Sequence, residues 1–379
     1  MPCSLRANCT VHMIGFKMNG FLASAFIWAA CCPVATFMCM PPVKCRAADG
    51  SSALQHTDSE RENPAALRCQ VNPLADHQVS MTIDGVEKLR WHCGSQYPRP
   101  YFFPFNGPSG VSLTRMGHPG APDHDHHQSI WFAHNKLNGV NFWGNASGAQ
   151  IRQKQWLCYQ DGAHEATMAV VLGWFAPDGT ELIEQELVAT LMPVEPSAVD
   201  GPAEHALELQ FTLRPAPGAK QIELEQTNFG FLAVRVAKSI SASFGGGKLS
   251  NSEGAVGEQA CFAKPARWMD YSGPLAVGQG SERKNVDEGI TFFDHPQNAR
   301  FPTHWHVRQD GWMGAAYNLE QADRIVADQP LTLRYLMHAH SGQYDPATAQ
   351  RVFEAFAKRT AWRVTKGTKP NYQFEARRL

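Results

Sequence analysis

Apolar and polar residues alternate with a period of two along much of the chain, which is the pattern of β-strands that bury one face. The first clear case is 79–83, which ends at a turn over Asp84-Gly85. Turn-forming residues then separate pairs of such segments, and we expect two hairpins, 172–191 and 207–224. Further strands are predicted at residues 231–236, 289–293, 312–317 and 331–338.

Helical periodicity is almost absent until near the C-terminal end. Asp345-Pro346 opens a segment, 347–358, in which Val352, Phe353 and Phe356 are spaced to bury one helix face. Strand after strand with short turns predicts an all-β fold, a large antiparallel β-sandwich with one C-terminal helix. The 31 glycines and 25 prolines, together with 10% aromatic residues, also favour β-structure over a helical bundle.

Charge and hydropathy exclude several classes of protein. The chain has 34 basic and 35 acidic residues, so it lacks the basic excess that nucleic-acid binding requires. Only one long uncharged stretch occurs, at 19–43, which excludes a polytopic membrane protein. With 43% hydrophobic residues, a chain of this length buries a core easily, and a disordered protein is excluded.

The N-terminal segment is typical of a targeting sequence. Lys17 precedes an uncharged run at 21–40, and small residues suited to cleavage follow at 45–48. Pro33 and Pro41 interrupt the run, which favours export with cleavage and no remaining membrane span. The alternative is a retained N-terminal membrane anchor. The predicted parts are a signal peptide at 1–47, a linker at 48–72, a β-sandwich domain at 73–365 and a basic C-terminal tail at 366–379.

The cysteines give no metal signature. Six of the ten lie before residue 48, and no C-x-x-C motif occurs among the others, which argues against a thiolate zinc site. Export permits disulfides, but the sequence leaves their pairing open among Cys69, Cys93, Cys158 and Cys261.

The histidines are clustered. Five of the 16 fall between His118 and His134, within a segment that also carries Asp123 and Asp125. Residues two apart in an extended strand face the same way, about 6.5–7 Å apart, so an H-x-H pair can share a metal or a substrate. Such pairs occur at His124/His126, His304/His306 and His338/His340.

We expect the two main histidine clusters to converge on one cleft. The candidate catalytic residues are His124, His126, His127, His134, His304, His306 and Asp123. The candidate substrate-binding residues are Arg115, Trp131, Asp294, His295, Trp305 and Arg308.

Three kinds of chemistry suit these residue types. Imidazole beside a carboxylate supports acid–base catalysis near neutral pH. Neutral imidazoles also ligate zinc or another divalent metal, and that set would be His124, His126, His304 and His306. Any single histidine could instead bond to a backbone carbonyl in the core, although packing so many polar groups together there is costly.

Several motifs of the chain resemble those of the DUF6807 family. They lie at 99–104, 123–134, 138–143, 230–236, 247–252, 266–273, 293–296 and 302–308. The resemblance covers nearly all of 75–360. Asp125 and Gln128 depart from it, because the family usually has Pro and Arg at these positions.

The resemblance implies a fold and a class of ligand. Members are frequent in planctomycetes and are often labelled methane oxygenase PmoA, but the spanning helices that such an enzyme needs are missing here. The family's pattern is similar to the galactose mutarotase-like supersandwich, whose concave sheet holds a sugar. We therefore expect an exported lyase, hydrolase or epimerase that acts on a sugar or oxidised sugar. The alternatives are a non-catalytic carbohydrate-binding protein and a metalloenzyme with histidine ligands.

Overall fold

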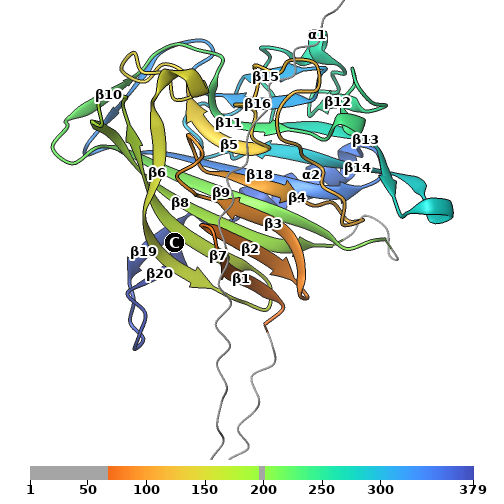
Figure 1. The fold of residues 1–379 in the computed structure, drawn as a ribbon, viewed down its shortest axis with the longest axis horizontal. Helices are drawn as coiled ribbons and strands as arrows, with labels where there is room; N and C mark the ends of the chain where they lie inside the picture. Colours follow the sequence, from red (N-terminus) through yellow and green to blue (C-terminus); the bar gives the residue numbers. More distant parts are fainter. Residues whose placement is uncertain (1–66, 196–200) are drawn as a thin grey trace, which may run out of the picture. The chain divides into compact units, whose positions relative to one another are not determined.

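The structure is a computed structural model that describes residues 67–195 and 201–379. The described chain is mostly β-strand, and two large antiparallel sheets dominate it (Figure 1). This confirms the predicted all-β sandwich. The predicted signal peptide, 1–47, and residues 48–66 of the linker lie outside the described residues.

The first sheet carries the features that matter for function. Its strands in spatial order are β1 (Cys69–Leu74), β2 (Gln78–Ile83), β3 (Val86–His92), β4 (Tyr101–Phe105), β5 (Ile130–His134), β11 (Gly230–Arg235), β16 (Trp312–Ala316) and β15 (Trp305–Arg308). The last four are brought together from distant parts of the sequence.

The second sheet packs against the first. Its strands in spatial order are β12 (Lys248–Asn251), β13 (Trp268–Val277), β14 (Lys284–Asp294), β18 (Leu331–Ser341), β9 (Glu204–Pro215), β8 (Glu181–Val194), β7 (Ala166–Phe175) and β6 (Gln150–Gln160). The smaller elements are the strand pairs β10 (Gln221–Leu224) with β17 (Asp323–Val326) and β19 (Trp362–Lys366) with β20 (Phe374–Arg378), the helices α1 (Glu258–Cys261) and α2 (Pro346–Ala357), and the 3-10 turns Asn145–Ser147, Lys238–Ile240 and Gly280–Glu282.

The hydrophobic core lies between the two sheets. Phe132 of β5 stacks on Phe211 of β9 with ring centroids 3.8 Å apart. Phe292 of β14 meets Trp305 of β15 edge-on, with centroids 4.9 Å apart. All four side chains are buried, as the period-two pattern predicts for inward-facing positions.

Of the two predicted hairpins, one is confirmed and the other is wrong. The hairpin over 172–191 is confirmed, because β7 pairs with β8. The hairpin over 207–224 is wrong: β10 pairs with β17, and β9 pairs with β8 and β18. A turn over Ala216–Ala219 does follow β9, but the chain then leaves the large sheet, so local turn chemistry did not determine the partner strand.

Both predicted ends of the sandwich domain differ from the structure. The strand β1, Cys69–Leu74, begins inside the expected linker, 48–72, and its Cys69 and Val71 are buried. In the expected basic tail, Phe374–Arg378 forms β20. The Arg378 guanidinium lies 3.9 Å from the centre of the Trp362 ring and binds Glu208 of β9, so this basic residue packs against the second sheet.

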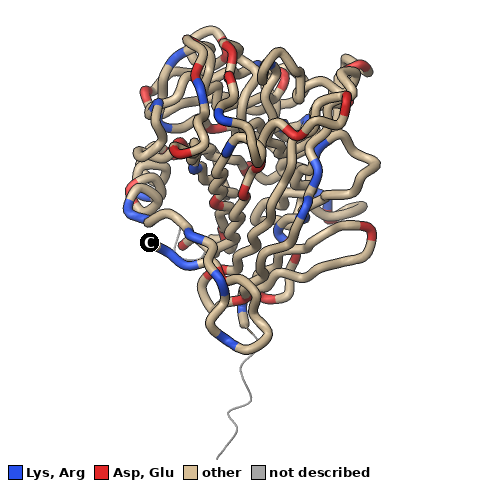
Figure 2. Tube along the Cα trace, turned by 90° about the vertical axis from the view of Figure 1, so that its left-hand side faces the viewer, with Lys and Arg blue, Asp and Glu red and all other residues tan. Residues whose placement is uncertain are grey.

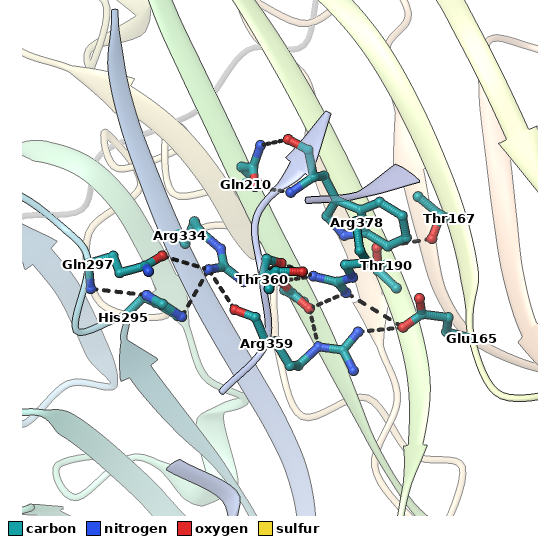
Figure 3. Close-up of polar contacts among 12 residues, drawn as sticks. Glu165, Thr167, Thr190, Gln210, His295, Gln297, Arg334, Arg359, Thr360 and Arg378 are labelled. Atoms are coloured by element: carbon teal, nitrogen blue, oxygen red, sulfur yellow. Dashed lines mark hydrogen bonds and ion pairs between the residues drawn. The ribbon is translucent and has the colours of Figure 1, made fainter. Parts of the chain in front are cut away.

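The predicted C-terminal helix is confirmed as α2, on the outer face of the second sheet. Phe353 packs against Trp268 of β13 with ring centroids 5.4 Å apart. Beyond the helix, Glu208 binds Arg334, Arg359 and Arg378, a set we call the arginine clasp (Figure 3). The clasp attaches the C-terminal segment to the second sheet.

Three further properties of the described residues concern charge, hydropathy and the cysteines. Acidic and basic positions are interspersed over the face shown in Figure 2. None of the helices described is long and apolar enough to cross a membrane. Cys69, Cys93, Cys158 and Cys261 are all unpaired thiols, and burial raises the pKa of Cys158 to about 11.

Candidate functional site

Alternation along β5 divides its side chains between the core and the outer face of the first sheet. Phe132 enters the core, so its neighbour Trp131 faces outward. Arg235 of β11 and Trp312 of β16 are directly paired across their strands and share this outer face. The Arg235 guanidinium lies 5.6 Å from the centre of the Trp312 ring.

Three tryptophans form what we call the indole cluster: Trp131, Trp143 and Trp312. Their ring centroids are 5.3 Å (Trp131 to Trp143), 5.3 Å (Trp131 to Trp312) and 5.5 Å (Trp143 to Trp312) apart. All three are almost fully buried, and Trp131 and Trp312 project from the face of the sheet opposite to Phe132. The outer face of the sheet therefore carries a second aromatic layer.

A loop of residues 115–128, which we call the histidine loop, packs on this layer. Its four histidine rings are neighbours, with centroids 4.4 Å apart for His126 and His127, 5.0 Å for His124 and His127, and 5.5 Å for His118 and His124. His127 contacts Trp312 with centroids 4.8 Å apart. Histidines and indoles thus form one continuous cluster.

Two arginines fix the position of the loop. Arg115 donates its Nε to Val236 O at 3.0 Å and its Nη2 to Asp310 O at 3.0 Å. Arg99 donates to Trp143 O at 2.6 Å and to Gln128 Oε1 at 3.2 Å. Both guanidiniums donate hydrogen bonds to acceptors within the protein. Arg115, which we expected to bind substrate, is therefore a positioning residue.

Asp310 organises the polar side of the cluster. Its Oδ1 accepts from Arg235 Nη1 at 2.6 Å, and its Oδ2 accepts from His118 Nε2 at 2.8 Å. Because Gly120 N donates to His118 Nδ1 at 3.0 Å, both ring nitrogens of His118 are engaged. His118 is therefore a positioning residue for the loop and not a free base.

His124 and His126 are partly exposed, and each has a ring nitrogen without a hydrogen-bond partner in the described chain. The His124 Nδ1–H donates to Asp123 Oδ1 at 2.8 Å, which leaves Nε2 as an acceptor on a side chain that is 40% exposed. Within the described chain, no hydrogen bond engages the His126 ring. Burial, followed by the charges of His124 and Arg99, lowers the pKa of His126 to about 4, so it is neutral at physiological pH.

Five buried polar atoms of this cluster have no hydrogen-bond partner in the described chain. They are the indole nitrogens of Trp131, Trp143 and Trp312, Nε of Arg235 and Nδ1 of His127. Buried polar groups are bonded in the great majority of cases, and leaving one unpaired costs about 1–3 kcal/mol. Five such atoms in one place make this cluster our candidate ligand site.

His306 of β15 extends the cluster. Its ring lies next to Trp312 with centroids 5.3 Å apart, and its Nδ1–H donates to Asn228 O at 3.0 Å. Burial, followed by the charge of Arg308, lowers the pKa of His306 to about 4. Since His127 also contacts Trp312, the two histidine-containing segments meet at this indole.

A family model described as a family of unknown function, DUF6807, matches residues 78–354. The chain belongs to the DUF6807 family. The match runs from β2 into α2 and includes every residue of the site described above. No curated protein matches the sequence.

Not every residue predicted for the site lies there in this DUF6807 chain. His134 lies on the same side of β5 as Phe132, where its Nε2 is 3.1 Å from Asn318 Oδ1. His304 binds Glu320 at 3.1 Å. It precedes β15, which begins at Trp305, so the strand alternation that sets His306 does not extend to it.

The predicted binding residues are also dispersed. Trp131 belongs to the indole cluster. Trp305 points into the core, where its Nε1 donates to Ala266 O at 2.8 Å, and Arg308 binds Glu258 at 2.9 Å. Asp294 ends β14 of the second sheet and His295 follows it, and burial raises the pKa of Asp294 to about 7.

The proposed metal-ligand set is not assembled. Within 67–195 and 201–379, no group of three or more His, Cys, Asp or Glu is arranged to hold a metal ion. His304 binds Glu320, apart from His124 and His126. The third H-x-H pair lies on β18 of the second sheet, where His338 binds Glu204 and His340 binds Asp270.

Sequence reasoning missed Arg235 and Asp310. The signal for Arg235 was present: a lone basic residue ends the apolar strand 230–234, and a buried charge needs a partner. Asp310 precedes Gly311 in the turn between β15 and β16, a place where aspartate is also common for turn geometry alone. The local sequence therefore did not distinguish an Asp310 that only shapes the turn from one that pairs with Arg235 and His118.

Proposed function

We propose that this DUF6807 protein acts on a carbohydrate by acid–base chemistry, as a lyase, hydrolase or epimerase, where the histidine loop meets the indole cluster. The observation that carries the proposal is the set of five unpartnered buried polar atoms beside stacked aromatic rings. A sugar offers both things that such a site needs, hydroxyl groups for the polar atoms and C–H faces for the rings.

The proton-transfer roles follow from the hydrogen bonds. Asp123 holds His124 in the tautomer whose Nε2 accepts a proton and stabilises the imidazolium that forms. The His126 ring lies next to His124, with the two ring centroids 5.3 Å apart. His126 is neutral and accepts a proton or hydrogen bond from a substrate hydroxyl. A pair of imidazoles can remove a proton and return it at another position.

The second candidate is a non-catalytic carbohydrate-binding protein. The low pKa of His126 favours it, because an imidazole with a pKa of about 4 is a weak base at neutral pH. Turnover separates the two candidates.

The experiment is incubation of the protein with a panel of glycosides and 3-keto-glycosides, followed by mass spectrometry. We expect new products from wild type, a loss of about a hundredfold or more in rate for His126→Ala, and little change for His304→Ala. His304 is the matched control, because it binds Glu320 and no residue of the cluster. Binding without product in wild type contradicts catalysis and supports the second candidate.

We also propose that the protein is exported. The support is Lys17 followed by the uncharged run at 21–40 and small residues at 45–48. N-terminal sequencing of protein recovered from the periplasm or medium should begin near Ala48. An intact N-terminus in the membrane fraction would instead support the anchored alternative.

A further inference from the structure

The charges around the cluster do not balance. Arg99 and Arg235 are 1% exposed and Arg115 is half-buried, whereas Asp310 is the carboxylate that pairs with one of them, Arg235. The hydrogen bonds described above for Arg99 and Arg115 go to carbonyl and amide oxygens. Burial lowers the pKa of each of these two guanidiniums to about 10, which still leaves both charged at neutral pH.

The acidic residues of the histidine loop do not correct this imbalance. Asp123 is 81% exposed and pairs with His124, and Asp125 is exposed and accepts from Asn145. Solvent weakens the effect of such exposed carboxylates on the buried guanidiniums, and burial outweighs the charge of Asp125 in the pKa of Arg99. The buried part of the site therefore keeps an excess of positive charge.

The unpartnered atoms point to the same polarity. Four of the five are donors with no acceptor function, namely three indole N–H groups and the Nε–H of Arg235. The Trp312 indole nitrogen lies beside Gly314, where an added Cβ would approach it to 3.0 Å. A ligand that satisfies such a set must present several acceptor oxygens.

We propose that the ligand is an acidic sugar, whose carboxylate is received by Arg235 Nε and the indole N–H groups where the histidine loop meets the indole cluster. This inference rests on the proposed carbohydrate function and specifies its substrate class. A carboxylate satisfies two facts at once, the excess of positive charge and the excess of donors, whereas a neutral hydroxyl brings its own donor to each contact.

The test is calorimetric titration of the wild-type protein with D-glucuronate and with D-glucuronamide, which has nearly the same shape but no charge. The same pair is repeated with D-galacturonate and D-galacturonamide, and malonate serves as a carboxylate without a sugar. We expect at least one of the two carboxylates to bind about tenfold or more tightly than its amide, with the difference shrinking as salt is added.

A protein variant locates the effect. Arg235→Lys keeps a positive charge opposite Asp310 but removes the Nε–H, and the preference for carboxylate over amide should fall severalfold. The matched control is Arg308→Lys, an exposed arginine paired with Glu258, which should keep the preference. If Arg235→Lys does not fold, the comparison of ligands in wild type still decides the proposal.

The outcomes separate the two proposals. Equal binding of carboxylate and amide overturns the acidic-sugar inference and leaves the carbohydrate function standing. Binding of malonate as tight as that of the sugar acids shows an anion site that ignores the sugar, and overturns both proposals. Binding of none of these compounds also overturns the acidic-sugar inference, and the glycoside panel then decides the carbohydrate function alone.

Discussion

At the scale of single residues, tryptophan serves two different purposes in this protein. Trp305 uses its indole N–H inside the core, as a donor to Ala266 O. Trp312 is equally buried, yet its N–H has no partner in the described chain. We propose that the same side chain is a structural element at one position and a binding group at the other, and the difference can be measured.

Replacing each tryptophan by phenylalanine should separate the two roles. Trp312→Phe removes an unsatisfied donor, so we expect weaker binding of D-glucuronate, by about fivefold, the worth of one hydrogen bond of about 1 kcal/mol. Trp305→Phe breaks a bond in the core, and we expect a loss of about 1–3 kcal/mol in the free energy of unfolding with binding nearly unchanged. Calorimetry and urea denaturation measure the two quantities.

The contrary result is equally specific. If Trp312→Phe binds as wild type does, the indole nitrogen is not a ligand contact, and the argument from unpartnered donors fails at its best-placed atom.

How far the sequence predicts the site depends on the kind of residue. The histidines stood out because they are dense in the chain, and His124, His126 and His127 do lie together. His134 and His304 also lie in histidine-rich segments, but His134 contacts Asn318 and His304 binds Glu320. A histidine's direction depends on where its strand begins and which face it occupies, and residue spacing alone does not define either.

At the scale of elements, α2 shows the clearest link between local sequence and structure. Asp345 accepts from the backbone N–H of Thr348 at 2.9 Å and of Ala347 at 3.4 Å, and Pro346 occupies the first turn. These signals, with the apolar spacing of Val352, Phe353 and Phe356, predicted the helix correctly. By contrast, β10 pairs with a strand about 100 residues away, which no local pattern specifies.

The cap of α2 should be measurable. Asp345→Ala removes the side-chain acceptor at the helix start, and we expect the free energy of unfolding to fall by about 1 kcal/mol. Asp345→Asn is the matched control and should retain most of that stability, because asparagine also caps well. A loss of the same size in both variants would mean that the carboxylate charge, and not capping, is what matters.

At the scale of the whole molecule, the arginine clasp connects the C-terminal segment to the middle of the second sheet (Figure 3). Glu208 is 1% exposed and receives Arg334, Arg359 and Arg378. Burial alone would raise the pKa of Glu208, but the bond and charge of Arg378, with the charge of Arg359 and the bond from Arg334, outweigh it and lower the pKa to about 2. The network therefore depends on the ionised carboxylate.

The clasp predicts acid sensitivity. Because the pKa of Glu208 is lower in the folded protein than its ordinary value of 4.5, the ionised group stabilises the fold above that value, and this stability is lost as the pH falls toward 2. Glu208→Gln should unfold more easily at pH 7 by about 3–5 kcal/mol, because it leaves the buried Arg334 guanidinium without a carboxylate partner. Its stability should also depend less on pH between 5 and about 2 than that of wild type, as measured by urea denaturation.

Glu375→Gln provides the comparison. The bonds from Thr368 and Arg377 also lower the pKa of Glu375 to about 2, but Arg377, its ionic partner, is 55% exposed. We expect a much smaller loss of unfolding free energy for Glu375→Gln than for Glu208→Gln, because solvent screens the exposed charge of Arg377. A loss as large as that of Glu208→Gln would contradict the view that burial gives the clasp its importance.

The indole cluster gives the protein a built-in optical reporter. Three of its ten tryptophans lie with ring centroids 5.3 to 5.5 Å apart, close enough for their electronic transitions to couple and for excitation to pass among them. The cluster should therefore dominate the near-ultraviolet circular dichroism of the folded chain. A ligand that bonds to these N–H groups changes the emission of all three rings together, so its arrival can be followed in unlabelled protein, on the millisecond scale of a stopped-flow instrument.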